Sequence, residues 1–158
     1  MIRRLLHSLA IALLLYVCWL AMTAIHEAGH VLGAKASGGV VNRVVWGPVS
    51  LSRTDVYPNP NPRLVTWAGP AFGALAPLLL EWLGRRSRFA NLLGVLAGFC
   101  LIANGAYLAS GVIYPVGDAR DLIHLGTRRW VLLAAGMPMC VVGLLIWHKV
   151  SPRFRLRH

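Results

Sequence analysis

The sequence has few charged residues, and acidic residues are the rarest of them. Only 13% of its 158 residues are Asp, Glu, Lys or Arg, and five acidic residues stand against sixteen basic ones. Soluble domains are about 25% charged, so this composition argues against a water-soluble globule. The basic residues stand in short runs between long apolar segments rather than in a stripe among polar neighbours. That pattern argues against a nucleic-acid partner and indicates the headgroups of a lipid bilayer.

Cysteines are also scarce, and no repeat or low-complexity tract is present. The three cysteines, Cys18, Cys100 and Cys140, lie in three different apolar segments, and no two have C-x-x-C spacing. An odd number without that spacing disfavours both a disulfide framework and a thiolate metal site. We expect all three to serve as small apolar residues.

Long apolar runs are the dominant feature. A helix needs about 20 residues to cross a hydrocarbon core of roughly 30 Å, and four segments are long enough. The predicted spans are residues 5–25, with the helix continuing to 36, and residues 64–83, 91–114 and 130–147. We therefore expect residues 1–158 to form one integral, multi-pass domain in a prokaryotic cell membrane. The first run is longer than the apolar part of a typical secretory signal, so we expect it to stay in the protein.

The loop between the first two spans contains a strand-like pattern. Valines surround a Gly47-Pro48 turn, and residues 49–52 alternate with the period of a strand. This predicts a short hairpin near residues 40–54. The prolines of Asn59-Pro60-Asn61-Pro62 exclude regular structure just before the second span. The predicted fold class is an all-α membrane protein with four transmembrane helices and a short β-hairpin in the first interhelical loop.

The segment His26-Glu27-Ala28-Gly29-His30 continues directly from the first apolar run. Residues i and i+4 lie on one face of a helix, about 6 Å apart along its axis, so the two imidazoles can bind one zinc ion. Glu27 lies roughly 100° around the helix and suits a general base that acts on metal-bound water. The alternative is a satisfied polar cluster. Ionisable groups at a membrane helix are costly to desolvate and usually mark function, which favours the metal site.

A catalytic zinc takes three protein ligands, so one more is needed. If all four segments cross, His7, Glu81 and His148 fall on the side opposite the motif. The candidates on the same side are Asp55, Asp118, Asp121 and His124.

Asp118 is the predicted third ligand, because it follows directly on the third span and should match the depth of the histidines. Asp121, His124 and Asp55 remain alternatives. Asp118 and Asp121 also have the spacing of an N-cap and an N3 acid that open a short helix through His124. Arg120 and Arg128 could pair with Asp121 as an ordinary ion pair.

Together these residues resemble the site-2 protease family of intramembrane zinc metallopeptidases. The zinc motif at 26–30, Ala68-Gly69-Pro70 in the second span and Pro115-Val116-Gly117-Asp118 after the third stand in the family's order. The similarity covers roughly residues 20 to 125. It implies a three-helix catalytic core, one Zn²⁺ ion per chain bound by His26, His30 and Asp118, and Glu27 as the catalytic base.

Two positions differ from the family's usual pattern. Ala119 replaces a glycine, and Gly73 replaces an asparagine. If that asparagine helps to hold substrate, its role is either vacant here or taken by another group, for which we consider Asn104 in the third span.

The expected function is hydrolysis of peptide bonds in membrane-embedded or membrane-proximal protein substrates. Zinc would activate a water molecule, with Glu27 as general base. A helical substrate must unwind locally, and the hairpin could add it as a strand or serve only as a cover. The alternative function is a non-proteolytic membrane module that binds partner helices, with zinc structural or absent. A zinc carrier would need ionisable residues along the spans, and the spans hold almost none.

Overall fold

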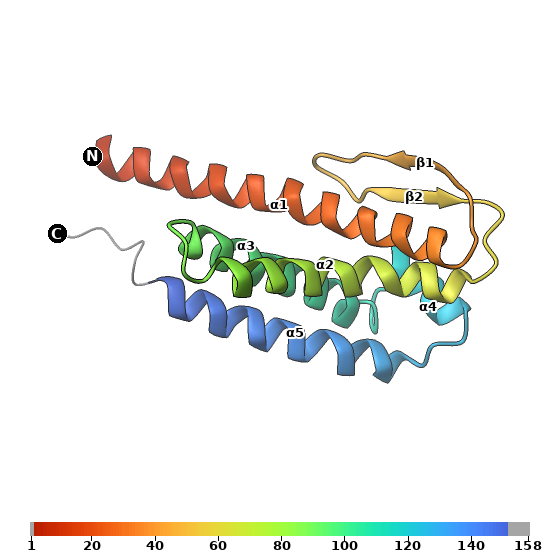
Figure 1. The fold of residues 1–158 in the computed structure, drawn as a ribbon. Helices are drawn as coiled ribbons and strands as arrows, with labels where there is room; N and C mark the ends of the chain where they lie inside the picture. Colours follow the sequence, from red (N-terminus) through yellow and green to blue (C-terminus); the bar gives the residue numbers. More distant parts are fainter. Residues whose placement is uncertain (1, 152–158) are drawn as a thin grey trace.

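The computed structural model describes residues 2–151, and these form a helical bundle with one hairpin (Figure 1). The elements in chain order are α1 (Ile2–Ala36), β1 (Val41–Val45), β2 (Arg53–Val56), α2 (Pro62–Gly84), α3 (Ala90–Ser110), α4 (Gly117–His124) and α5 (Arg129–Val150). Four of them, α1, α2, α3 and α5, are long and apolar enough to cross a membrane. The predicted fold class is confirmed, with the hairpin between the first two long helices.

The third long helix is shorter than predicted. It ends at Ser110 rather than at residue 114, and the backbone N–H groups of Ile113 and Tyr114 both donate to the Ser110 carbonyl in a turn. Hydropathy continues through this turn and so does not mark the helix end. The residue before a proline disfavours helical backbone, and Pro115 follows here.

The second long helix begins within the proline-rich segment. Pro62 is its first residue, so the prediction that this segment excludes regular structure was wrong at that position. Proline is tolerated in the first helical turn because its missing N–H would have no partner in the helix. The side chain of Asn61 caps the helix by accepting a hydrogen bond of 3.1 Å from the backbone N–H of Leu64.

The hairpin pairs β1 with β2 in antiparallel register, with Val41 opposite Val56 and Val45 opposite Arg53. Residues 49–52, which were predicted to belong to a strand, lie in the connecting loop. The backbone N–H of Gly47 donates to Ser52 Oγ at 3.0 Å, which closes this loop into a bend. Val49, within it, is 85% exposed. The alternation at 49–52 is therefore not that of a paired strand.

The hairpin folds back along α1 instead of extending beyond its end (Figure 1). Trp19 Nε1 donates a 3.0 Å hydrogen bond to the carbonyl of Pro48, in the loop that joins the strands. Trp19 precedes His26 by seven residues, which corresponds to about 10 Å along the helix axis. The hairpin therefore runs beside the second half of α1, at the depth of the motif.

The long helices pack so that α2 and α3 lie between α1 and α5, with the start of α1 and the end of α5 at one end of the bundle and α4 at the other (Figure 1). Gly29 and Gly33 allow α1 to approach α2 closely, since a Cβ on Gly33 would lie 2.6 Å from Ala68 Cβ. Leu108, Ala119, Leu122 and Leu132 form a buried cluster that fixes α4 against α3 and α5.

All three cysteines are free, and two of them are fully buried.

Candidate metal centre

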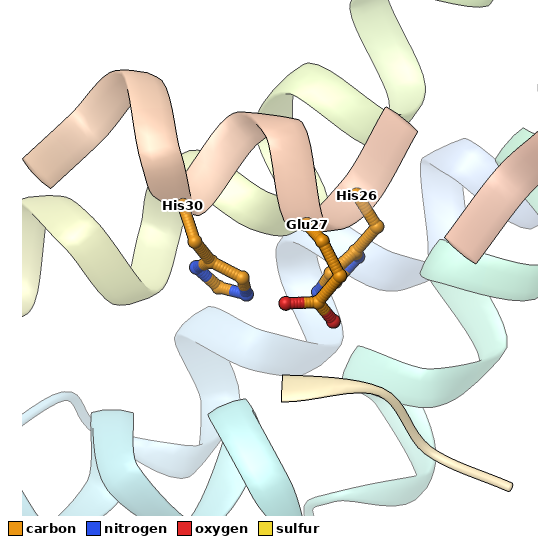
Figure 2. A group of neighbouring side chains, drawn as sticks. All are labelled: His26, Glu27 and His30. Atoms are coloured by element: carbon orange, nitrogen blue, oxygen red, sulfur yellow. The ribbon is translucent and has the colours of Figure 1, made fainter. Parts of the chain in front are cut away.

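His26, Glu27 and His30 lie together on the buried side of α1. They are 9%, 4% and 7% exposed, and their potential ligand atoms all lie within 4.8 Å of one another. Figure 2 shows the three side chains leaving α1 with their polar ends gathered in one place. The two imidazole rings converge, as their i, i+4 spacing predicts. This group could hold a metal ion.

Asp118 meets both histidines from across the bundle. Its Oδ2 atom lies 2.8 Å from His26 Nε2 and 3.4 Å from His30 Nε2. The carboxylate is not used to cap α4, because the N-cap is Val116 and that helix has no side-chain cap. The structure thus brings the predicted third ligand to the histidine pair.

Two neighbours fix the position of Asp118. Its backbone N–H donates a 2.7 Å hydrogen bond to the hydroxyl of Tyr107 on α3. Gly117, the preceding residue, has a φ angle of +49° and packs directly against the same hydroxyl. A side chain at position 117 would be strained by this backbone conformation and would displace Tyr107. The first turn of α4 is therefore held against α3 by contacts between its backbone and the Tyr107 side chain.

The charge of Asp118 follows from its surroundings. Burial raises the pKa of its carboxyl group, but the hydrogen bonds and charges of the His26 and His30 rings outweigh burial and lower the pKa to about 2. Asp118 is therefore a carboxylate at neutral pH and can only accept hydrogen bonds.

The hydrogen bonds of the two rings show that a cation fits this site. His26 Nδ1 lies 2.7 Å from Asn104 Oδ1, and His30 Nδ1 lies 2.8 Å from the carbonyl of Val65. Both partners are acceptors, so both Nδ1 atoms carry hydrogen. Each neutral ring then presents a lone pair on Nε2 toward the carboxylate. Protonating both rings would put two positive charges side by side in a buried place, whereas one metal ion satisfies all three acceptors.

The other predicted candidates are occupied elsewhere. Asp121 is half-exposed and lies 3.3 Å from Arg120 Nε, the surface pair expected for it. Asp55 pairs with Arg43 and Arg53, and the hydrogen bond from Arg43 is the main cause that lowers the pKa of its carboxyl group. These two acids therefore already have guanidinium partners.

His124 is exposed on the last turn of α4. His7, Glu81 and His148 lie near the start of α1, the end of α2 and the end of α5, and these parts are at the end of the bundle opposite α4 (Figure 1). Asp118 is thus the candidate from the sequence that lies beside the histidine pair, with its Oδ2 atom close to both Nε2 atoms.

Sequence reasoning missed Thr54. Its hydroxyl, on β2, donates a 2.7 Å hydrogen bond to Glu27 Oε2. A threonine in a short strand carries no local signal of this role, because the contact exists only when the hairpin folds back along α1. The hairpin therefore contributes directly to the surroundings of the predicted base.

The side-chain amide of Asn104 is already hydrogen-bonded within the protein. Its side chain is 1% exposed, and both polar atoms are used within the protein, by His26 and by the carbonyl of Cys100. The amide stands behind the His26 ring.

A cavity of about 920 Å³ opens at the histidine pair. The second half of α1 lines one side, and residues of β2, α2, α3 and α4 also line it, with Thr54, Asn104 and Asp118 among them. Cavities that hold drug-sized ligands range up to about 1,000 Å³, so this one has room for a short extended stretch of peptide.

No protein-family model, no curated protein and no solved structure matches the chain. The three motifs that carry the resemblance to site-2 proteases nevertheless meet at one place in the fold. Gly69, from the second motif, packs against both imidazoles, and a Cβ there would lie 2.8 Å from His26 Nε2. The middle motif thus leaves room for the rings that the first motif supplies.

Proposed function

We propose that this protein is an intramembrane zinc metallopeptidase of the site-2 protease kind, which hydrolyses peptide bonds of membrane-embedded or membrane-proximal protein substrates. The observation that carries the proposal is the convergence of His26 Nε2, His30 Nε2 and Asp118 Oδ2 beside the carboxylate of Glu27. Catalytic zinc sites take three such nitrogen and oxygen ligands and keep a fourth position open. The helix that carries the motif is long and apolar enough to span a membrane.

His26, His30 and Asp118 would hold the ion, which supplies a Lewis acid that makes water a nucleophile near neutral pH. Glu27 would act as the base: it takes a proton from the attacking water and passes it to the leaving amine. Thr54 holds one oxygen of the carboxylate, Oε2, and so orients the group while Oε1 stays available for the proton.

The substrate would enter as an extended segment. A transmembrane helix satisfies its backbone groups internally, so it must unwind before a peptide bond can be attacked. Among residues 2–151, β2 pairs along one edge, with β1, and β2 lines the cavity. The other edge of β2 can therefore offer backbone donors and acceptors to an unwound substrate.

The proposal is tested by cleavage of a membrane-tethered reporter in reconstituted vesicles. Glu27→Gln keeps the shape of the side chain but removes the base, so we expect cleavage to fall by about 10²- to 10⁴-fold. Bound zinc should remain at one ion per chain, because Glu27 is not a proposed ligand. The matched control is Glu81→Gln, which changes the other glutamate of the chain, on the last turns of α2, and should cleave like the wild type.

Equal cleavage by the wild type and Glu27→Gln would exclude Glu27 as the base. If neither protein cleaved the reporter while both kept one zinc ion per chain, the result would support a non-proteolytic membrane module with structural zinc.

A further inference from the structure

Asn104 on α3 is a fully buried polar residue between α2 and the metal centre. Its side-chain amide makes two hydrogen bonds: Nδ2 donates to the carbonyl of Cys100 at 2.8 Å, and Oδ1 lies 2.7 Å from His26 Nδ1. Since the residue is 1% exposed, both bonds are shielded from water. A buried amide that is satisfied in this way is held in one orientation.

That orientation fixes the hydrogen on the His26 ring. A backbone carbonyl only accepts, so the NH₂ end of the amide must face Cys100 and the oxygen must face the ring. The facing ring atom, Nδ1, must then carry the hydrogen. Nε2 is left with its lone pair, and this is the atom that lies 2.8 Å from Asp118 Oδ2. For His30 the backbone carbonyl of Val65 has the same effect.

Gly73 on α2 provides the space for this amide. A Cβ at position 73 would lie 2.8 Å from Asn104 Nδ2 and 2.9 Å from Oδ1. These distances are shorter than real Cβ contacts, so any side chain at 73 would push the amide away from His26. Gly73 and Asn104, on two different helices, therefore act on the same contact.

We infer that Asn104 is a positioning residue, which holds His26 in the tautomer and ring orientation that a metal ion requires, and that Gly73 is the complementary gap. The inference rests on the proposed role of His26 as a zinc ligand. It replaces the substrate-holding role considered for Asn104 from the sequence. Outer partners of metal-binding histidines act in this way, and their loss weakens metal binding by about 10- to 100-fold.

The test measures zinc affinity of the full chain in detergent by competition with a chromophoric chelator. Asn104→Leu has nearly the same shape but no acceptor, and should bind zinc about 10- to 100-fold more weakly than the wild type. Asn104→Asp keeps an acceptor for His26 but loses the donor to the Cys100 carbonyl, so it should bind zinc more weakly than the wild type and more tightly than Asn104→Leu. Gly73→Ala should lose affinity like Asn104→Leu, although alanine favours helix more than glycine. Helical circular dichroism and elution volume check that each variant is folded.

A second measurement separates positioning from substrate holding. At saturating zinc, Asn104→Leu should recover cleavage with an unchanged KM for the reporter. Wild-type zinc affinity together with a raised KM would overturn the inference and restore the substrate-holding role. Equal loss of zinc by the Leu and Asp variants with the fold intact would also overturn it, because the residue would then serve packing alone. Failure of the wild type to bind zinc would remove the proposed function as well, whereas tight binding by every variant removes only this inference.

Discussion

Glycines serve opposite purposes in two regions of this molecule. At the candidate metal centre, Gly69 and Gly73 on α2 leave space for polar side chains, the two imidazoles and the amide of Asn104. At the interface of α3 and α5, Gly143 leaves space for backbone, since a Cβ there would lie 2.8 Å from the carbonyl of Gly98. In the first region, the missing side chain makes room for polar groups of the candidate site. In the second region, it lets two helices approach closely.

The difference shows how the two regions are specified. The α3–α5 interface needs only small residues at the right spacing, and many apolar sequences would satisfy it. The metal centre needs particular atoms at particular places, because each buried polar group there must find its partner. We therefore expect the same substitution, glycine to alanine, to have different consequences in the two regions.

The largest effect is expected for Gly69→Ala. The new methyl group would occupy the place of the imidazole rings, 2.8 Å from His26 Nε2. We expect zinc affinity to fall by at least about 100-fold, the upper end of the range for outer partners, because the ligands themselves are displaced. Helix content should be kept, since alanine favours helix. Chelator competition measures the zinc affinity, and circular dichroism measures the helix content. A Gly69→Ala variant that binds zinc as tightly as the wild type would show that the rings can move aside and that the glycine is not required.

A smaller effect is expected for Thr54→Val, which probes the polar region without touching a proposed ligand. The substitution removes the hydroxyl that donates to Glu27 Oε2 at 2.7 Å and keeps the branched shape. Loss of one hydrogen bond to a charged group should lower the cleavage rate about tenfold. Zinc affinity should not change, and Thr54→Ser should cleave like the wild type. An unchanged rate for the valine variant, or a serine variant as slow as it, would contradict the role of the hydroxyl.

The smallest effect on the metal centre is expected for Gly143→Ala, the matched counterpart of Gly69→Ala. The methyl group would press on the carbonyl of Gly98 and separate α3 from α5 slightly. Overpacking costs about 1–3 kcal/mol, and better helix propensity offsets up to about 1 kcal/mol, so we expect stability to fall by about 1 kcal/mol. Unfolding in mixed micelles measures this. Zinc affinity of the folded protein should equal that of the wild type, and a parallel loss of zinc would show that the two regions are coupled.

Local pattern predicted much of the fold. Hydropathy located the four long helices, and the i, i+4 spacing predicted that His26 and His30 converge. Connectivity alone placed Asp118 on the same side as the motif. Two predictions were wrong because hydropathy and apolar–polar alternation do not show which backbone groups are hydrogen-bonded. The helix α3 ends at Ser110, inside an apolar run, and residues 49–52 alternate between apolar and polar side chains without belonging to a strand.

The candidate site was only partly predictable. Spacing could not choose between Asp118 and Asp121, since both lie on one short helix three residues apart. The structure separates them: one carboxylate faces the imidazoles, and the other faces Arg120 at the surface. Thr54 was not predicted at all, because its partner is reached only through the fold of the hairpin.

The sequence by itself determined that four apolar helices form, and that two imidazoles and a glutamate emerge together where the first apolar run ends. These properties depend on neighbours within one or two helical turns. Tertiary structure alone decided that Asp118 and Asn104 meet opposite nitrogens of the His26 ring, across 92 and 78 residues of chain. Such contacts depend on how closely the helices approach, and small residues such as Gly33, Gly69 and Gly73 set that approach by the volume they leave empty.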